Sequence, residues 1–215
     1  MTAVSAGVRE GLRERKKAET RQALAAAALE LAEALGPDGV TVEAIAEAAG
    51  VSPRTFFNYF ATKEDAVVGM SPAHSSALLA DLVARPAGEA PLEALRATAL
   101  AAAARLEAGA DDWMRRRALF HRHPTLAGRQ AARLAEVERG MVEEIARRTG
   151  LDPDADPYPA LVVAAALGAI RVAIATWTTR ARPGSLTDHL DATFAQLAAG
   201  LPDPSDPSNP SNPLR

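Results

Sequence analysis

The sequence predicts an all-α protein. Alanine dominates the composition, aromatic residues make up only 4% of 215 positions, and few segments alternate polar and apolar residues as half-buried strands do. Proline and glycine clusters separate apolar patterns that repeat at helical spacing. With 48% hydrophobic residues, the chain is globular and long enough for a small domain joined to a larger one. We predict two helical domains, the smaller at the N-terminus.

The chain begins with a predicted basic arm, residues 1–16, and a first helix follows from about Lys17 to Leu35. Apolar residues at helical spacing predict the buried stripe of this helix: Leu24, Ala27, Ala28, Leu31 and Leu35. Gly36 ends the helix. For Arg13 to Arg21 we predict contacts with phosphates or a minor groove, with Arg21 among them, whereas the first eight residues fit a solubilising tail equally well.

The stretch from Thr41 to Lys63 predicts a helix, a tight turn and a second short helix. Thr41 is a good N-cap for the first helix, and Gly50 gives the turn its conformational freedom. Ser52 and Pro53 restart the chain as a helix, with serine as the N-cap and proline at the first helical position. Phe56 and Phe60 lie four apart and face inward.

The second helix, predicted over eight residues, 53–60, then exposes basic, amide and aromatic side chains to solvent. Major-groove reading of DNA explains this pattern, because arginine bonds guanine edges, asparagine bonds adenine edges, and threonine and aromatic rings contact methyl groups and phosphates. An ordinary helical hairpin with exposed aromatics is the alternative. The predicted outward side chains are Arg54, Thr55, Phe57, Asn58 and Tyr59.

The stretch TVEAIAEAAGVSPRTFFNYFATKED resembles the DNA-binding signature of the tetracycline-repressor (TetR) family, and the match extends back to about Arg13. The resemblance implies a three-helix DNA-binding domain over residues 17–69, with Lys63 beside a DNA phosphate at the start of a fourth helix capped by Thr62. Two positions depart from the usual signature. Phe57 replaces a common tyrosine and lacks its hydroxyl, and Ala32 replaces a phenylalanine, which predicts a different packing neighbour.

The resulting assignment of DNA contacts gives base reading to Arg54 and Asn58, and phosphate contacts to Thr41, Tyr59 and Lys63. The full predicted DNA-binding set is Arg21, Thr41, Ser52, Pro53, Arg54, Thr55, Phe57, Asn58, Tyr59 and Lys63. A net charge of −3 does not oppose this, because the placement of basic residues, concentrated in the first stretch, determines the electrostatic footprint.

The larger domain, residues 70–200, is predicted to hold six further helices, and the proline-rich tail, residues 201–215, to be disordered. The predicted helices are 73–84, 91–108, 111–123, 126–149, 158–181 and 185–200. Two segments, RRRALFHRHPTLAGRQ and ALVVAAALGAIRVAIATW, are similar to the mycofactocin-regulator branch of the family. The resemblance implies a ligand-binding and dimerisation domain.

The helix predicted over 158–181 is nearly free of charge, yet Arg171 interrupts it and no second span accompanies it. We therefore predict burial against a partner subunit instead of a membrane span, with the 185–200 helix completing a four-helix dimer interface. A central helix of a monomer is the alternative. The predicted interface residues are Ala164, Gly168 and Ala175.

A small-molecule site is predicted from aromatic, apolar and arginine side chains on two helices: Trp113, Met114, Arg117, Phe120, His121, Arg171, Ile174 and Trp177. Alanine-rich walls leave room for an apolar ligand, and Arg117 or Arg171 could hold an acidic group. Plain core packing is the alternative, with Arg171 paired to Glu143 or Asp191. Fatty acids, acyl thioesters and aromatic acids fit best, in keeping with ligands common in the family.

Other functional classes have no support in the sequence. There is no cysteine, and His121 and His123 do not share a helix face, so neither a metal nor another cofactor is predicted. The nucleophile elbow, Walker loop and dinucleotide fingerprint of enzymes do not occur. No apolar leader precedes the basic arm, which predicts a cytoplasmic protein.

These features predict a homodimeric transcriptional repressor whose two recognition helices enter successive major grooves of a pseudo-palindromic operator, and which a ligand releases. Two alternatives stay open. One is a DNA-binding dimer with a vestigial pocket that acts without a ligand, and the other is an α-helical enzyme.

Overall fold

The computed structural model describes residues 3–69, 72–107, 109–179 and 184–203, without side chains for 3–14 and 72–75. Over these residues the protein contains ten α-helices, one short 3₁₀ helix and no strand, so the all-α prediction is confirmed. The predicted disordered tail lies mostly outside the described residues. The chain forms two compact units, one of Met1–Ser75 with Asp111–Leu134, and the other of Ser76–Ala110 with Ala135–Arg215.

Unit 1 is built around the long helix α1 (Ala3–Leu35), followed by the 3₁₀ helix η1 (Pro37–Gly39), α2 (Val42–Ala48), α3 (Pro53–Phe56) and α4 (Lys63–Val68). Helix α7 (Ala110–Arg122) and the first part of α8 (Pro124–Thr149) add to the same unit. Leu24, Leu29, Ile45, Phe56 and Phe60 have at most 1% of their surface exposed and form the centre of its core.

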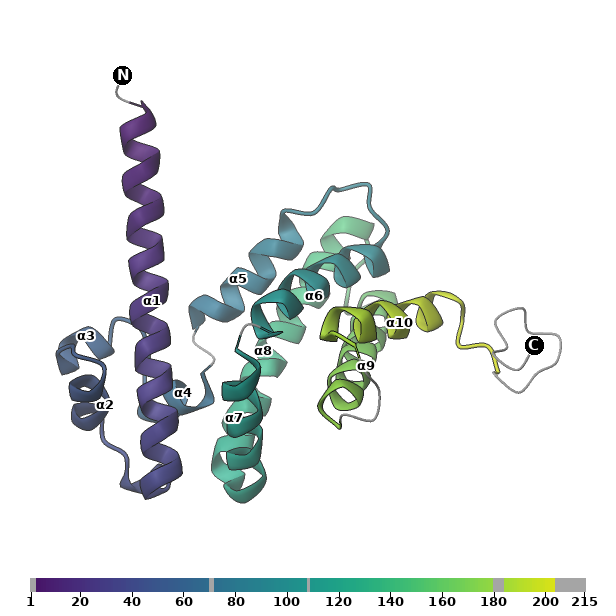
Figure 1. Ribbon diagram of the computed structural model, residues 1–215. Helices are drawn as coiled ribbons and strands as arrows, with labels where there is room; N and C mark the ends of the chain where they lie inside the picture. The colour runs from purple at the N-terminus through teal and green to yellow at the C-terminus, as the bar shows by residue number, and fades with distance from the viewer. Residues whose placement is uncertain (1–2, 70–71, 108, 180–183, 204–215) are drawn as a thin grey trace. The chain divides into compact units, whose positions relative to one another are not determined.

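Helix α1 ends at Leu35 as predicted but differs from the prediction at its start. It begins at Ala3 instead of about Lys17, and its first half extends beyond α2, α3 and α4 (Figure 1). No proline interrupts residues 3–16, and extending a helix costs far less than starting one. The predicted buried stripe is confirmed for Leu24, Ala27 and Ala28, whereas Leu31 is only partly buried. Leu35 is 59% exposed because the helix ends there, so its predicted burial was wrong.

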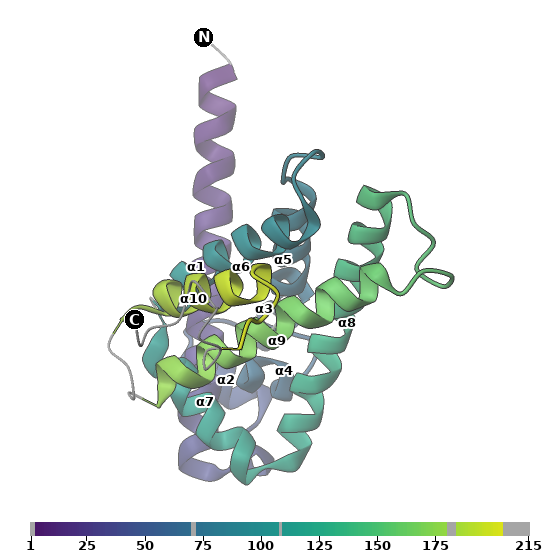
Figure 2. The same ribbon diagram turned by 90° about the vertical axis from the view of Figure 1, so that its right-hand side faces the viewer.

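Unit 2 contains α5 (Pro72–Val83) from Ser76 onward, α6 (Pro91–Glu107), the second part of α8, α9 (Tyr158–Thr178) and α10 (Leu186–Ala198). The predicted bounds of these helices agree with the structure to within about three residues, since proline, glycine and capping serine mark their ends. Helix α10 packs on α9 and α6, and Figure 2 shows the three helices next to one another.

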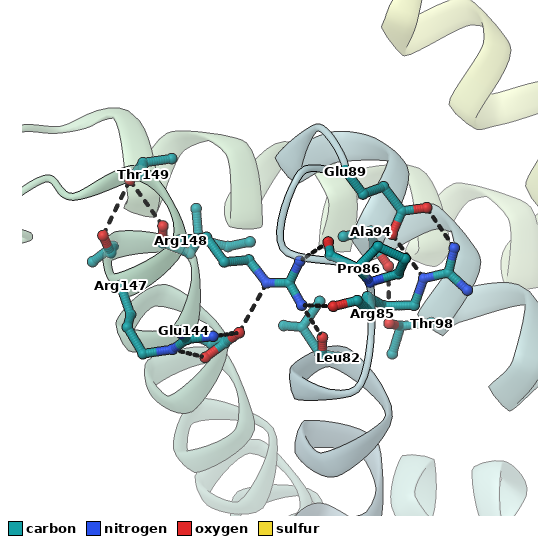
Figure 3. Close-up of polar contacts among 12 residues, drawn as sticks. Leu82, Arg85, Pro86, Glu89, Ala94, Thr98, Glu144, Arg147, Arg148 and Thr149 are labelled. Atoms are coloured by element: carbon teal, nitrogen blue, oxygen red, sulfur yellow. Dashed lines mark hydrogen bonds and ion pairs between the residues drawn. The ribbon is translucent and has the colours of Figure 1, made fainter.

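An arginine network joins α8 to the end of α5 in unit 2 (Figure 3). The guanidinium of Arg148, whose side chain is 2% exposed, donates to the carbonyl oxygens of Leu82, Arg85 and Pro86 and to the carboxylate of Glu144. The carbonyls of Leu82 and Pro86 also accept from backbone N–H groups, so the Arg148 bonds add to the local turns and tie α8 to the segment that ends α5. Hydrogen bonds from Arg147, together with those from Arg148, hold the pKa of Glu144 below its ordinary value.

Candidate nucleic-acid interface

The helix-turn-helix of unit 1 is fixed by local hydrogen bonds at both helix starts. The hydroxyl oxygen of Thr41 accepts from the backbone N–H of Ala44 at 3.1 Å, and that of Ser52 accepts from Thr55 at 3.1 Å. Both predicted N-caps are therefore confirmed. Between the helices, Gly50 has a φ of 67°, a left-handed conformation that favours glycine.

Helix α3 is shorter than the eight residues predicted. It spans Pro53–Phe56, after which the N–H groups of Asn58 and Tyr59 bond to carbonyls three residues back, at 3.1 and 2.9 Å. Bonds of this spacing tighten the chain into a turn of 3₁₀ type. The tighter turn still brings Phe60 under Phe56, with ring centroids 5.8 Å apart and both rings buried.

The two buried rings leave a polar and aromatic surface on the other side. Phe57 is 59% exposed and stands edge-on to the Phe56 ring at 5.4 Å. Arg54 and Asn58 are exposed, and no hydrogen bond or ion pair within the described residues engages either side chain. Their donors and acceptors are thus available to an external partner.

The other predicted contact residues divide by exposure. Thr41, Ser52 and Pro53 are exposed, whereas Arg21, Thr55 and Tyr59 are half-buried. The Tyr59 ring packs against the core of unit 1, so only part of this side chain faces outward. The predicted contact residues from Ser52 to Tyr59 therefore lie on one continuous segment in and after α3, backed by the buried rings of Phe56 and Phe60, whereas Arg21 and Thr41 come from other segments.

Lys63 has a structural contact that the sequence did not indicate. Its ammonium donates to the carbonyl of Val40 at 2.7 Å and to that of Asp38 at 3.2 Å, which ties the start of α4 to the turn before α2. An ammonium has three donors, so one N–H is left for a further acceptor. Thr62 caps α4 as predicted, accepting from the N–H of Asp65 at 3.1 Å.

Arginines of α7 and α8 hold α4 from both ends, and sequence reasoning missed this. Arg116, with a side chain 14% exposed, donates to the carbonyls of Val67 at 3.2 Å and Ala25 at 3.1 Å. Burial lowers the pKa of this guanidinium. At the other end, the buried carboxylate of Asp65 lies 3.4 Å from Arg133.

Gly69, which ends α4, makes room for Arg116. Its φ of 74° favours glycine, and a side-chain carbon placed there would come within 2.7 Å of the Arg116 guanidinium. The neighbouring Arg115 instead pairs with Glu33 of α1 and holds the pKa of that carboxyl below its ordinary value. The sequence did not indicate which of the three consecutive arginines, 115–117, would be buried.

The predicted ligand-binding residues of α7 lie in unit 1. The Arg117 guanidinium lies over the Trp113 ring, 5.6 Å from its centroid, in a cation–π contact. Phe120 packs against the core of the unit, while Met114 and His121 are exposed. The structure thus brings Trp113 and Arg117 together, but it gives Arg117 an aromatic neighbour on its own helix.

The predicted ligand-binding residues of α9 lie in unit 2. Ile174 and Trp177 are half-buried and pack against the core of that unit, whereas Arg171 is exposed. The suggested pairing of Arg171 with Asp191 is not made in the structure, because Asp191 accepts from Arg96 at 2.6 Å. Glu143, the other suggested partner, is exposed on α8.

The described residues leave an apolar face of α9 uncovered. Ala164 is exposed and Gly168 and Ala175 are half-buried, and the same face carries Leu161 and Val172, which are 66% and 53% exposed. Helix α9 is the one described helix long and apolar enough to cross a membrane, with only 22% of its most apolar window buried. Isolated exposed leucines are ordinary, but a continuous apolar face is typical of an interaction surface.

Comparisons with known proteins agree with this geometry. Residues 24–67 match the family model of bacterial regulatory proteins of the tetR family, and residues 89–202 match that of the MftR C-terminal domain. The HTH-type transcriptional regulator TcmR of Streptomyces glaucescens is 40% identical over 177 residues, covering 80% of this chain and 78% of that protein.

Among solved structures, the fatty acid degradation regulator FadR of Bacillus halodurans has a similar fold. Its TM-score is 0.53 at 17% identity, covering 85% of this chain and 96% of that one. The helix-turn-helix, the two family models and the TcmR relative agree, and they confirm the resemblance noted in the sequence. The chain belongs to the TetR family of DNA-binding transcriptional regulators, which are not enzymes.

Proposed function

We propose that this regulator is a homodimeric repressor that binds a pseudo-palindromic operator and leaves it when a small molecule binds. The observation that carries the DNA-binding part is the exposed group of Arg54 on α3 and of Phe57 and Asn58 in the turn after it, backed by two buried phenylalanine rings. The backing fixes the segment, so its polar groups are positioned before DNA arrives. The cytoplasm is the compartment in which we expect it to act.

For DNA reading we propose the assignment predicted from the sequence. Arg54 and Asn58 contact base edges in the major groove, Phe57 contacts a thymine methyl group, and Thr41, Tyr59 and Lys63 contact phosphates. The Thr41 oxygen already accepts from Ala44, but its hydroxyl proton is still free to bond a phosphate. In a two-fold dimer the two copies of α3 meet half-sites about 34 Å apart.

For the dimer we propose that the apolar face of α9 packs on the same face of a second copy, with α10 beside it. The support is the exposure of Leu161 and Val172 together with the small residues Ala164 and Gly168, which permit close approach of two helices. Such an interface is isologous, so each of these residues faces the partner's copy of the same surface.

For the effector we propose a mainly apolar small molecule. The aromatic and aliphatic residues that support it, Trp177 and Ile174, pack in the alanine-rich core of unit 2. The predicted acidic anchor has less support, since Arg117 lies over Trp113 and Arg171 is exposed. Release from DNA requires that the effector bind the non-binding conformation more tightly than the DNA-bound one.

Sequencing of DNA selected by the purified protein from a random pool tests this function. We expect a pseudo-palindrome with two half-sites separated by one helical turn. Enrichment of an unpaired half-site would contradict the dimeric arrangement, and the absence of any enriched sequence would contradict sequence-specific binding.

The variant Arg54→Ala is expected to lose sequence preference while keeping its binding to DNA in general. Loss of a bidentate contact to a base costs about 1–3 kcal/mol of discrimination. A gel-shift competition between the selected operator and a scrambled duplex measures this directly. Arg139→Ala, which removes an exposed positive charge from α8, is the control and should keep the preference. Full preference in Arg54→Ala would show that Arg54 does not read bases.

The variant Lys63→Ala is expected to weaken binding to all sequences alike. If the third N–H of the ammonium bonds a phosphate, the slope of log affinity against log salt concentration becomes about one unit less steep. Titrations at several salt concentrations give the slope. A drop in affinity with an unchanged slope would contradict the phosphate contact and would mean that Lys63 acts only by holding the turn at Asp38 and Val40.

A further inference from the structure

A histidine in the core of unit 2 has a polar atom without a partner. His189 is 9% exposed and lies on the inner face of α10 with Leu186, Leu190 and Phe194. Its Nε2 atom is fully covered and has no hydrogen-bond partner within the described part of the chain. A buried nitrogen in this state destabilises the folded protein, because water bonds it in the unfolded chain.

Two polar contacts between α6 and α10 flank this histidine, one on each side. The Glu107 carboxylate accepts from the backbone N–H groups of Leu186 and Thr187, and Arg96 donates to Asp191 at 2.6 Å. Between Arg96 and Glu107, α6 reads ATALAAAARL. Helices α6 and α10 pack together, and the buried hydroxyl of this α6 stretch, on Thr98, already donates to the carbonyl of Ala94 at 2.9 Å.

Helix α9 packs on α10 in the same core, and the residue ahead of α10 lies beside the histidine. Ala173 is buried in the same core, and Ile174 and Trp177 pack against it. Ahead of α10, a side-chain carbon placed on Gly184 would lie 3.9 Å from His189 Nε2 and 3.4 Å from the Asp188 carboxylate. Gly184 thus lies beside the Nε2 atom of His189, and the negatively charged carboxylate of Asp188 lies beside the same glycine.

The charges beside His189 restrict the chemistry of a ligand. Asp188 accepts from the N–H of Ser185 at 2.8 Å, and this bond lowers the pKa of its carboxyl, so the group is ionised at neutral pH. A carboxylate ligand at Nε2 would face the negative charge of Asp188. A hydroxyl group carries no charge, and it can donate to Nε2 or accept from it, whichever ring nitrogen holds the proton.

We infer that His189 is the polar anchor of the effector site, between α6, α9 and α10, and that the effector is a mainly apolar molecule bearing a hydroxyl group, such as a phenol. The inference rests on the proposed function and names the chemistry of its effector. Binding supplies the missing hydrogen bond, the small alanine side chains leave room for the ligand, and Trp177 offers it an apolar ring.

The first test is the thermal stability of the unliganded protein. If Nε2 has no partner in the unliganded protein, replacing the histidine with an apolar residue removes the cost of burying it. His189→Leu should therefore stabilise the folded protein and raise Tm by about 2–4 °C. Thr98→Val is the matched control, since it removes a buried hydroxyl that already has a partner, and it should not raise Tm. A lower Tm for His189→Leu would overturn the inference, because it would show that a structural bond satisfies Nε2.

The second test is calorimetric titration of the full chain at pH 7 with three probes: 1-naphthol, 1-methoxynaphthalene and 1-naphthoate. We expect 1-naphthol to bind at least about tenfold more tightly than either of the others, since a site built for a hydroxyl rejects analogues that cannot pair with it. His189→Leu should abolish this preference. His189→Gln, whose amide reaches the position of Nε2, should keep part of it, and Thr98→Val should keep all of it.

Three results of the titrations would each overturn the inference: equal binding of 1-naphthol and 1-methoxynaphthalene, tighter binding of 1-naphthoate, or no binding of any probe. None of these titrations involves DNA. A protein that selects a palindromic operator but fails them retains the proposed DNA-binding function and loses this effector site. A protein that selects no DNA loses the proposed function whatever the probes do.

Discussion

Replacing Gly168 with leucine is expected to turn the proposed dimer into a folded monomer. Within the described chain, a side-chain carbon placed on Gly168 has no heavy atom within 4 Å, so the first carbon of leucine starts in open space. Leucine also has the higher helix propensity, by somewhat under about 1 kcal/mol, so the monomer itself should not be destabilised. In the proposed dimer the same side chain would force two α9 helices apart, and overpacking of this kind costs about 1–3 kcal/mol.

Each such dimer contains two copies of the substitution. The dissociation constant of the dimer should therefore rise by about tenfold to a hundredfold or more. Sedimentation velocity over a range of concentrations measures this, and circular dichroism checks that the helices remain. Operator affinity should fall as well, because a monomer reaches only one half-site.

Gly128→Leu is the matched control for this experiment. Gly128 is also a helical glycine, on α8, and a side-chain carbon there likewise has no described heavy atom within 4 Å. This variant should remain dimeric. If Gly168→Leu sediments as a stable dimer like Gly128→Leu, the interface does not include Gly168, and another surface must cover the apolar face of α9.

Replacing Arg148 with methionine is expected to cause the largest loss of stability of any single change considered. The arginine is 2% exposed and bonds three backbone carbonyls and Glu144, and methionine fills a similar volume without any donor (Figure 3). The carbonyls of Leu82, Arg85 and Pro86 would lose these bonds, and Glu144 would lose one of its two positive partners. Removal of one member of a buried ion pair costs about 3–5 kcal/mol.

Arg147→Met provides the comparison, because it removes the other partner of the same carboxylate. The Arg147 side chain is 63% exposed and bonds Glu144 at 2.7 and 2.8 Å. An exposed pair is worth only about 0–1 kcal/mol, so this variant should remain close to the parent protein. Urea unfolding of both variants gives the two free energies. Equal, small losses would show that the three carbonyl contacts of Arg148 contribute little.

Much of the fold followed from local patterns in the sequence. The N-caps at Thr41, Ser52 and Thr62 were predicted because a hydroxyl three residues ahead of a backbone N–H satisfies it without help from distant segments. The buried pair Phe56 and Phe60 was predicted from a spacing of four. The family also followed from the sequence, since the helix-turn-helix signature lies within one short continuous stretch.

The roles of the three consecutive arginines were decided only by tertiary structure. Arg115 pairs with Glu33, Arg116 is buried against the carbonyls of Ala25 and Val67, and Arg117 lies over Trp113. Only the last of these partners lies on the same helix. Arg116 finds acceptors 49 and 91 residues away, and no local pattern encodes such a distance.

The same reason accounts for Lys63 and His189. The sequence identified Lys63 as a cation beside the DNA-reading helix, but the carbonyls it bonds belong to a turn that only folding brings near. Nothing in the sequence distinguished His189 from other histidines, because its burial and its unpaired Nε2 result from the packing of α6, α9 and α10. A residue's type and helical position are local properties, whereas the partners left for its polar atoms depend on which distant segments pack against it.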